Sequence, residues 1–236
     1  IAKKLTPWFE RLGVEDKPDD STDTSRLRGS VYGMLSRYAN TPKVEKVSAQ
    51  LANQYLADPS NVPRSIATRA LRNMARFSDQ DWFTKLRDFY VANTDANIRG
   101  TISRAMIFTD EQQITKALDF ALSDHVSPAN AMINVYAAIS GLDDQTIFYI
   151  WLDKNFDALS KKMPAYHIAR MPEYFSSSCD ADNIMLAEKF YAGKKQNFEG
   201  MARSYDIAID SAKQCLSLKD NNQANFNRYL KAATNN

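Results

Sequence analysis

Paired histidines at helical spacing are a strong sign of a metal-dependent hydrolase, and this chain lacks them. Its only two histidines, His125 and His167, lie far apart in a sequence of 236 residues. In the motif H-E-x-x-H, two histidines one helical turn apart bind one zinc ion, and the glutamate activates the bound water. We expect His125 to be exposed in a turn and His167 to have a core or surface role. The sequence therefore predicts no catalytic residue and no metal site.

Cys179 and Cys215 are the only cysteines, and their spacing is not that of metal ligands. A nucleophilic Cys179 would need a histidine placed against it, which the sequence does not indicate. Two free thiols are the favoured interpretation, because disulfides are rare in reducing compartments; a disulfide between the two is the alternative.

Arginines form a stripe on one predicted helix, where Arg69, Arg72 and Arg76 follow i, i+3, i+7 spacing. The favoured interpretation is a solvated face, and the alternative is contact with an acidic partner or with nucleic-acid phosphates. The chain carries 30 basic and 28 acidic side chains, a net charge of +2. This balance does not favour nucleic-acid binding.

The composition favours helix nearly throughout. Hydrophobic residues make up 44% of the chain, with only 7 glycines and 8 prolines. No apolar run reaches the roughly 18 residues that a membrane span needs, and no signal peptide is recognisable. The chain begins at Ile1 without a start methionine, so we expect a piece of a longer protein. Its compartment is left open.

Apolar residues recur at helical spacing along the whole chain. The predicted N-caps include Asp23 or Thr24, Asp79, Asp95, Asp110 and Ser127. Residues 14–24 are predicted to be a linker too polar to pack, and the three tryptophans are predicted to be core residues. The predicted helices span about 1–12, 25–40, 42–57, 63–77, 79–93, 95–108, 110–122, 127–140, 144–159, 164–175, 180–193, 198–218 and 220–230.

The first helices of successive pairs begin at intervals of roughly 32 to 38 residues, which is typical of a helical repeat. One helical hairpin cannot bury its apolar face alone, so neighbouring hairpins stack. We therefore expect an all-α fold, an α-solenoid of antiparallel helix pairs of the HEAT/ARM type. Residues 1–236 are expected to form a single helical-repeat domain.

The stretch 115–159 resembles the C-terminal helical domain of the M1 family of zinc aminopeptidases. In that family a Trp and an Asn-(Trp/Phe)-Asp element close the corresponding helix, matching Trp151 and residues 155–157. Leu12-Gly13 with Leu27-Arg28 is similar to the "LGW…LR" pattern near the start of this domain in the family. Phe175-Ser176-Ser177 with residues 187–190 is similar to its "F-(S/T)-(S/T)…(V/A)-x-x-F-F" segment. The similarity covers roughly the whole chain, in order.

The resemblance implies a bowl that packs against the catalytic domain of the same polypeptide and encloses a chamber. Such a domain limits and positions peptide substrates and contacts the C-terminal end of longer ones. The two motifs of the catalytic domain, H-E-x-x-H and G-x-M-E-N, are absent here; residues 200–203 match the second only in their first letters. This chain is therefore expected to be no enzyme by itself, and zinc is expected in the catalytic domain of the parent.

The family has no short substrate-contact motif in this region, so the substrate-facing residues are hypotheses. The candidates are Arg99, Arg104, Tyr166, His167 and Arg170. The main alternative function is a free-standing α-solenoid scaffold for protein–protein interaction, and nucleic-acid binding is a third, less favoured one.

Overall fold

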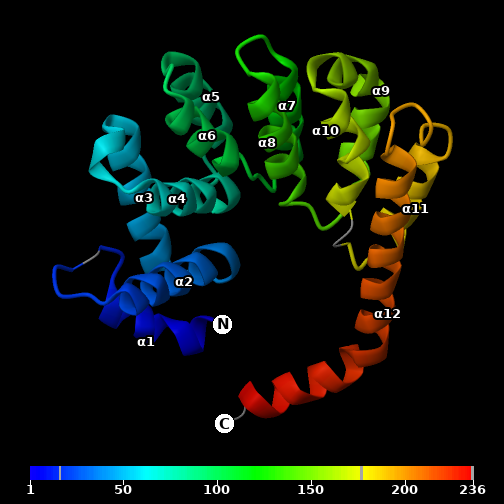
Figure 1. Cartoon of the computed structure of the whole chain (residues 1–236). Coiled ribbons are helices and arrows are strands. Elements are labelled where there is room, and N and C mark those ends of the chain that lie inside the picture. Colours follow the sequence, from blue (N-terminus) through cyan, green and yellow to red (C-terminus); the bar gives the residue numbers. More distant parts are fainter. Residues whose placement is uncertain (16, 176–177, 235–236) are drawn as a thin grey trace. The chain divides into compact units, whose positions relative to one another are not determined.

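A computed structural model describes residues 1–15, 17–175 and 178–234 (Figure 1). The described residues form helices and connecting turns, with no strand among them. The all-α prediction is therefore confirmed. The chain separates into two compact units, Ile1–Leu142 and Asp143–Asn236, here called unit 1 and unit 2. Each is described by itself.

Unit 1 consists of eight described α-helices and one 3₁₀ turn. They are α1 (Ala2–Leu12), α2 (Thr22–Tyr38), α3 (Pro42–Ala57), η1 (Pro59–Asn61), α4 (Arg64–Phe77), α5 (Trp82–Ala92), α6 (Ala96–Ala105), α7 (Glu111–Leu122) and α8 (Pro128–Ile139). Contacts join α1 to α2, α3 to α4, α5 to α6 and α7 to α8. Contacts also run from α2 to α4, from α4 to α6 and from α6 to α8, so these four helices form a continuous row.

Short polar side chains begin most of these helices. Asp95, Asp110 and Ser127 accept hydrogen bonds from backbone N–H groups of the first turns, as predicted. Two other N-caps differ from the sequence prediction. Ser21 caps α2 in place of Asp23 or Thr24, and Asp81 caps α5 in place of Asp79.

The entry to unit 1 is more ordered than the predicted polar linker. Arg28 is only 2% exposed, and its Nε donates to the Leu12 carbonyl over 2.9 Å. Its guanidinium also pairs with Asp20, which belongs to that linker. Gly13 has a φ of 69°, a conformation that favours glycine. The Leu-Gly…Leu-Arg element thus closes the turn between α1 and α2, and the prediction that residues 14–24 are too polar to pack was wrong at Asp20.

Unit 2 consists of α9 (Thr146–Lys162), α10 (Ala165–Ala169), η2 (Met171–Phe175), α11 (Ala181–Tyr191) and α12 (Met201–Thr234). The single helix predicted over 164–175 is divided at Arg170, because Pro172 cannot donate a backbone hydrogen bond and its ring opposes the preceding turn. The two helices predicted over 198–218 and 220–230 are one, because no glycine or proline interrupts α12.

Aromatic rings fill the core of unit 2. Phe156 and Phe190 lie 5.5 Å apart between ring centroids, and Phe190 also meets Tyr149 and Tyr191. Trp151 is buried, and its carbonyl accepts a hydrogen bond from the Asn155 side chain. Trp151, Asn155 and Phe156, which carried part of the family resemblance, therefore have structural roles, whereas Asp157 is exposed. Ser176 and Ser177 lie outside the described residues.

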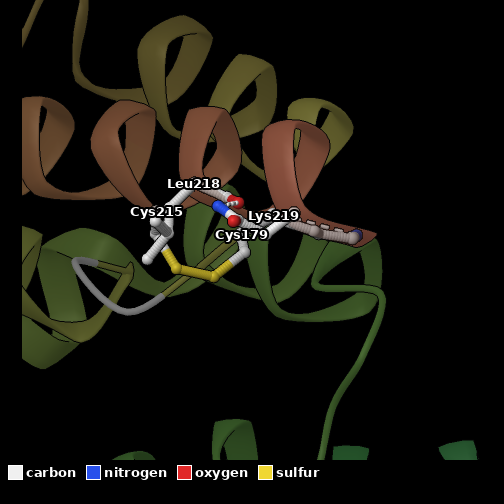
Figure 2. Close-up of a disulfide and its surroundings, with 5 residues drawn as sticks. Cys179, Cys215, Leu218 and Lys219 are labelled. Carbon is white, nitrogen blue, oxygen red and sulfur yellow. Dashed lines mark hydrogen bonds between the residues drawn. A yellow bond between two sulfur atoms is a disulfide. The ribbon is translucent and has the colours of Figure 1, made fainter. Parts of the chain in front are cut away.

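Two sequence interpretations need correction. Trp82 and Trp151 are buried, but Trp8 is 42% exposed and lies under the guanidinium of Arg11. Cys179 and Cys215 form a disulfide, with their Cα atoms 4.9 Å apart (Figure 2), so the prediction of two free thiols was wrong. Sequence spacing could not show this pairing because it depends on how η2, α11 and α12 pack.

Candidate functional site

A groove in unit 1 is lined by four arginines, Arg37, Arg69, Arg72 and Arg76. We call it the arginine groove; its volume is about 390 Å³. None of its described lining residues is acidic. Its arginine side chains come from α2 and α4, and the end of α8 adds two hydroxyl-bearing residues: Arg37, Arg69, Arg72, Arg76, Tyr136 and Ser140.

Glycines inside helices make room for the guanidinium groups. A Cβ atom at Gly33 of α2 would lie 3.0 Å from Nε of Arg69, and one at Gly29 would lie 3.6 Å from Nη1 of the same residue. Gly100 of α6 stands in the same relation to Arg104, at 3.0 Å. Glycine in a helix costs roughly 0.5–1 kcal/mol relative to alanine. These glycines therefore allow arginine side chains to lie close to the helix backbone, at a cost in helix stability.

Arg72 lies close enough to the other arginines of the groove to be affected by their charges. Its Nε donates to the Arg104 carbonyl over 2.7 Å, which fixes the side chain across α4 and α6. Burial lowers the pKa of Arg72, and the positive charges of Arg37, Arg104 and Arg69 lower it further. An arginine nevertheless stays protonated at neutral pH. The arrangement thus holds several like charges together, and an anion would relieve their repulsion.

Arg76 supplies a free donor. Its Nε is buried and has no hydrogen-bond partner within the described residues. A buried donor without a partner costs free energy, which a bound acceptor recovers. Tyr136, 55% exposed, adds an aromatic side chain to the same groove. The groove can therefore hold carboxylate or phosphate groups by charge-assisted hydrogen bonds.

The five substrate-facing candidates fall in both units, with Arg99 and Arg104 in unit 1 and the other three in unit 2. Arg104 adjoins the arginine groove through its contact with Arg72. Arg99 is held by its own surroundings: its Nε donates to the Asn93 carbonyl over 2.6 Å, and its guanidinium lies 5.0 Å from the Tyr90 ring centroid.

The other three candidates lie in or directly after α10 of unit 2. The rings of Tyr166 and His167 are 3.8 Å apart between centroids. Arg170 forms an ion pair with Glu173 over 2.8 Å, and a hydrogen bond from Arg170 lowers the pKa of Glu173. Tyr166 is 60% exposed, so this cluster is open to solvent. Its role in substrate contact stays a prediction.

Sequence reasoning found the stripe on α4 but missed Arg37, Tyr136 and Ser140. These residues reach the groove only through the packing of α2 and α8 against the row of helices, which local periodicity does not specify. One local signal was present. Gly29 and Gly33, four residues apart inside a predicted helix, indicate a close approach by another element.

The described residues include no group of three or more His, Cys, Asp or Glu side chains placed to hold a metal ion. His125 is exposed, as expected, and His167 is partly buried. Within the described part of the chain, no helix combines the length and apolarity that crossing a membrane requires.

Comparison with known proteins adds one finding. The family model described as "ERAP1-like C-terminal domain" matches residues 1–214, which is most of the chain. A search of curated proteins finds no match.

Proposed function

The chain belongs to the ERAP1-like C-terminal domain family, and from this we propose that it is the non-catalytic C-terminal domain of a zinc-dependent M1 aminopeptidase. In this role it caps the chamber above the active site and limits or positions peptide substrates. The zinc ion and the reacting groups belong to the catalytic domain of the same polypeptide. The domain acts by placing the substrate and excluding folded chains.

The fold proposed for this role is an α-solenoid of the HEAT type. The continuous row formed by α2, α4, α6 and α8, each also contacting the preceding helix, supports it. Stacked helix pairs of this kind offer a long surface on which an extended peptide can lie.

The arginine groove is the observation that carries the peptide-contact part of the proposal. A peptide presents carboxylates at its C-terminus and at Asp and Glu side chains. Several guanidinium groups without an acidic neighbour in the groove are suited to bind them. We therefore assign Arg37, Arg69, Arg72 and Arg76 to the binding of peptide carboxylates, with Arg104 supporting Arg72.

Binding of a fluorescent glutamate-rich peptide to this chain tests the assignment, with a glutamine-substituted peptide of the same length as the reference. We expect the Arg72→Gln variant to weaken binding roughly tenfold, the value of one charge-assisted hydrogen bond. Binding should also weaken as salt rises. Arg87→Gln is the control, because Arg87 pairs with Asp88 outside the groove and its loss should leave affinity unchanged. Equal binding of the two peptides would overturn the assignment.

Kinetics of the full-length parent enzyme test the proposal that this domain limits or positions peptide substrates. Arg72→Gln should raise KM for long acidic peptides and leave the hydrolysis of a single aminoacyl dye unchanged, because the dye is too short to reach the groove. Equal effects on both substrates would contradict the proposal. A parent without aminopeptidase activity would instead favour the free-standing scaffold.

A further inference from the structure

The long helix α12 has two different halves. In its first half Met201, Tyr205, Ala208 and Ile209 are buried, and the helix contacts η2, α10 and α11. Beyond Ala212 no described side chain of the helix is buried. The second half, residues 217–233, is exposed on all sides and is here called the α12 arm.

The disulfide lies at the boundary between these halves. Cys215 follows the last buried residue, Ala212, by three positions, and Cys179 immediately precedes Asp180, the N-cap of α11. Figure 2 shows the link between the turn before α11 and the side of α12. One turn further along, Nζ of Lys219 donates to the Cys179 carbonyl over 3.1 Å. A covalent bond and a hydrogen bond thus fasten α12 where its packing ends.

We propose that the Cys179–Cys215 bond is a native clamp that stops the fraying of the α12 arm from spreading into the packed half of α12, and that this protein matures in an oxidising compartment. An exposed helix end opens readily because few buried contacts oppose it. Unwinding that starts at the C-terminal end of α12 and continues past Cys215 would separate this residue from Cys179. The disulfide prevents that separation. Reduction removes that restriction.

Forming the clamp requires an oxidant. Two S–H bonds break and one S–S bond forms, so the two thiols release two protons and two electrons. A thiol–disulfide oxidoreductase of the compartment takes up the electrons as its own disulfide is reduced to two thiols. Both cysteines are partly exposed, so such a partner and small reductants can reach them. Persistent bonds of this kind belong to secreted, periplasmic or cell-surface proteins rather than to reducing compartments.

Thiol counting tests the compartment. The full-length protein is taken from the cells that make it, quenched in acid, denatured and alkylated without reductant. We expect Cys179 and Cys215 to remain unalkylated until a reductant is added. Alkylation of both residues before reduction would overturn the proposed oxidising compartment.

Hydrogen exchange followed by mass spectrometry tests the clamp, with the oxidised protein compared with the reduced protein and with a C179S/C215S variant. We expect amides of residues 201–216 to exchange at least about tenfold faster after reduction. Amides of residues 217–233 should exchange fast in every sample, and those of α4 in unit 1 should not change. Unchanged exchange over residues 201–216 would refute the clamp, and the reduced wild-type protein decides the point if the variant does not fold.

Discussion

Unit 1 and unit 2 both bury aromatic rings and both use buried side-chain hydrogen bonds, but only unit 2 adds a disulfide. In unit 1, polar side chains connect neighbouring helices: the Tyr32 hydroxyl and the Ser48 Oγ are 2.9 Å apart, and Nδ2 of Asn73 donates to the Ser36 carbonyl over 2.7 Å. In unit 2, the Asn183 side chain makes similar hydrogen bonds with the backbone of Asp143 and Gln145, rings cluster around Phe190, and a disulfide fastens α12.

This difference bears on function. Buried hydrogen bonds are directional, so they fix the register of α2, α3 and α4, and with it the positions of the groove arginines. Aromatic packing and a covalent bond resist separation but tolerate small shifts of register. Under the proposed function, ligand binding is assigned to unit 1, which contains the arginine groove, and a supporting role to unit 2.

The largest effect is expected from Phe190→Ala in unit 2. Removing a buried aromatic ring from a packed core costs about 3–5 kcal/mol of unfolding free energy. Urea unfolding of the full chain measures the loss, and Phe226→Ala, at an exposed position of the α12 arm, should change stability by less than about 0.5 kcal/mol. Equal effects of the two substitutions would show that the ring cluster does not hold unit 2 together.

Arg28→Ala is expected to have the largest effect in unit 1. The substitution leaves the Leu12 carbonyl without this donor and Asp20 without its ion partner, so we expect a loss of about 3 kcal/mol. The exposed Arg26→Ala is the control and should be nearly neutral. A small effect of Arg28→Ala would mean that water replaces the guanidinium at the entry to α2.

Alkaline pH tests the contribution of the buried Tyr32 hydroxyl of unit 1 to stability. Burial raises the pKa of Tyr32 from 10.0 to about 12, although the hydrogen bond with Ser48 opposes the shift. The unfolded chain therefore loses this proton first, and the stability that Tyr32 contributes is complete below pH 10 and is lost as pH rises toward 12. The loss approaches about 3 kcal/mol, since each pKa unit is worth 1.36 kcal/mol.

Tyr32→Phe measures that share, because it keeps the ring and removes the ionising hydroxyl. Urea unfolding between pH 9 and 12 should show a shallower decline for the variant than for the wild type. Parallel declines would assign the alkaline loss to other buried tyrosines, such as Tyr149 and Tyr191 of unit 2, whose pKa values burial also raises.

The smallest effect on stability is expected from Gly33→Ala. Alanine favours the helix by up to about 1 kcal/mol, but its Cβ would displace the Arg69 side chain. Thermal unfolding should show an unchanged or slightly higher Tm, while affinity for the glutamate-rich peptide falls. Gly193→Ala in unit 2 is the control, because nothing lies within 4 Å of its Cβ position. A variant with full peptide affinity would show that Arg69 does not need its close approach to α2.

The sequence predicted those features that depend on residues close together in the chain. Caps such as Asp95, Asp110 and Ser127 act within a few residues, so their helices began where expected. The break at Arg170 was not predicted, although Pro172, two residues later, is a local signal for it. The disulfide was missed because it joins segments that only packing brings together.

The candidate site was partly predictable for the same reason. Arg69, Arg72 and Arg76 share one helix, and their periodicity revealed them. Arg37 and Tyr136 come from other helices and join them only in the folded unit. The glycines beneath Arg69 were readable in the sequence, but their partner was not.

Hydrogen exchange of the full chain, with and without the glutamate-rich peptide, tests the central claim that unit 1 holds the ligand. We expect slower exchange in α2, α4 and the end of α8, around Arg37, Arg72 and Ser140, with no change over residues 146–175 or 181–216. Protection confined to unit 2, or no protection at a peptide concentration well above the measured Kd, would contradict it.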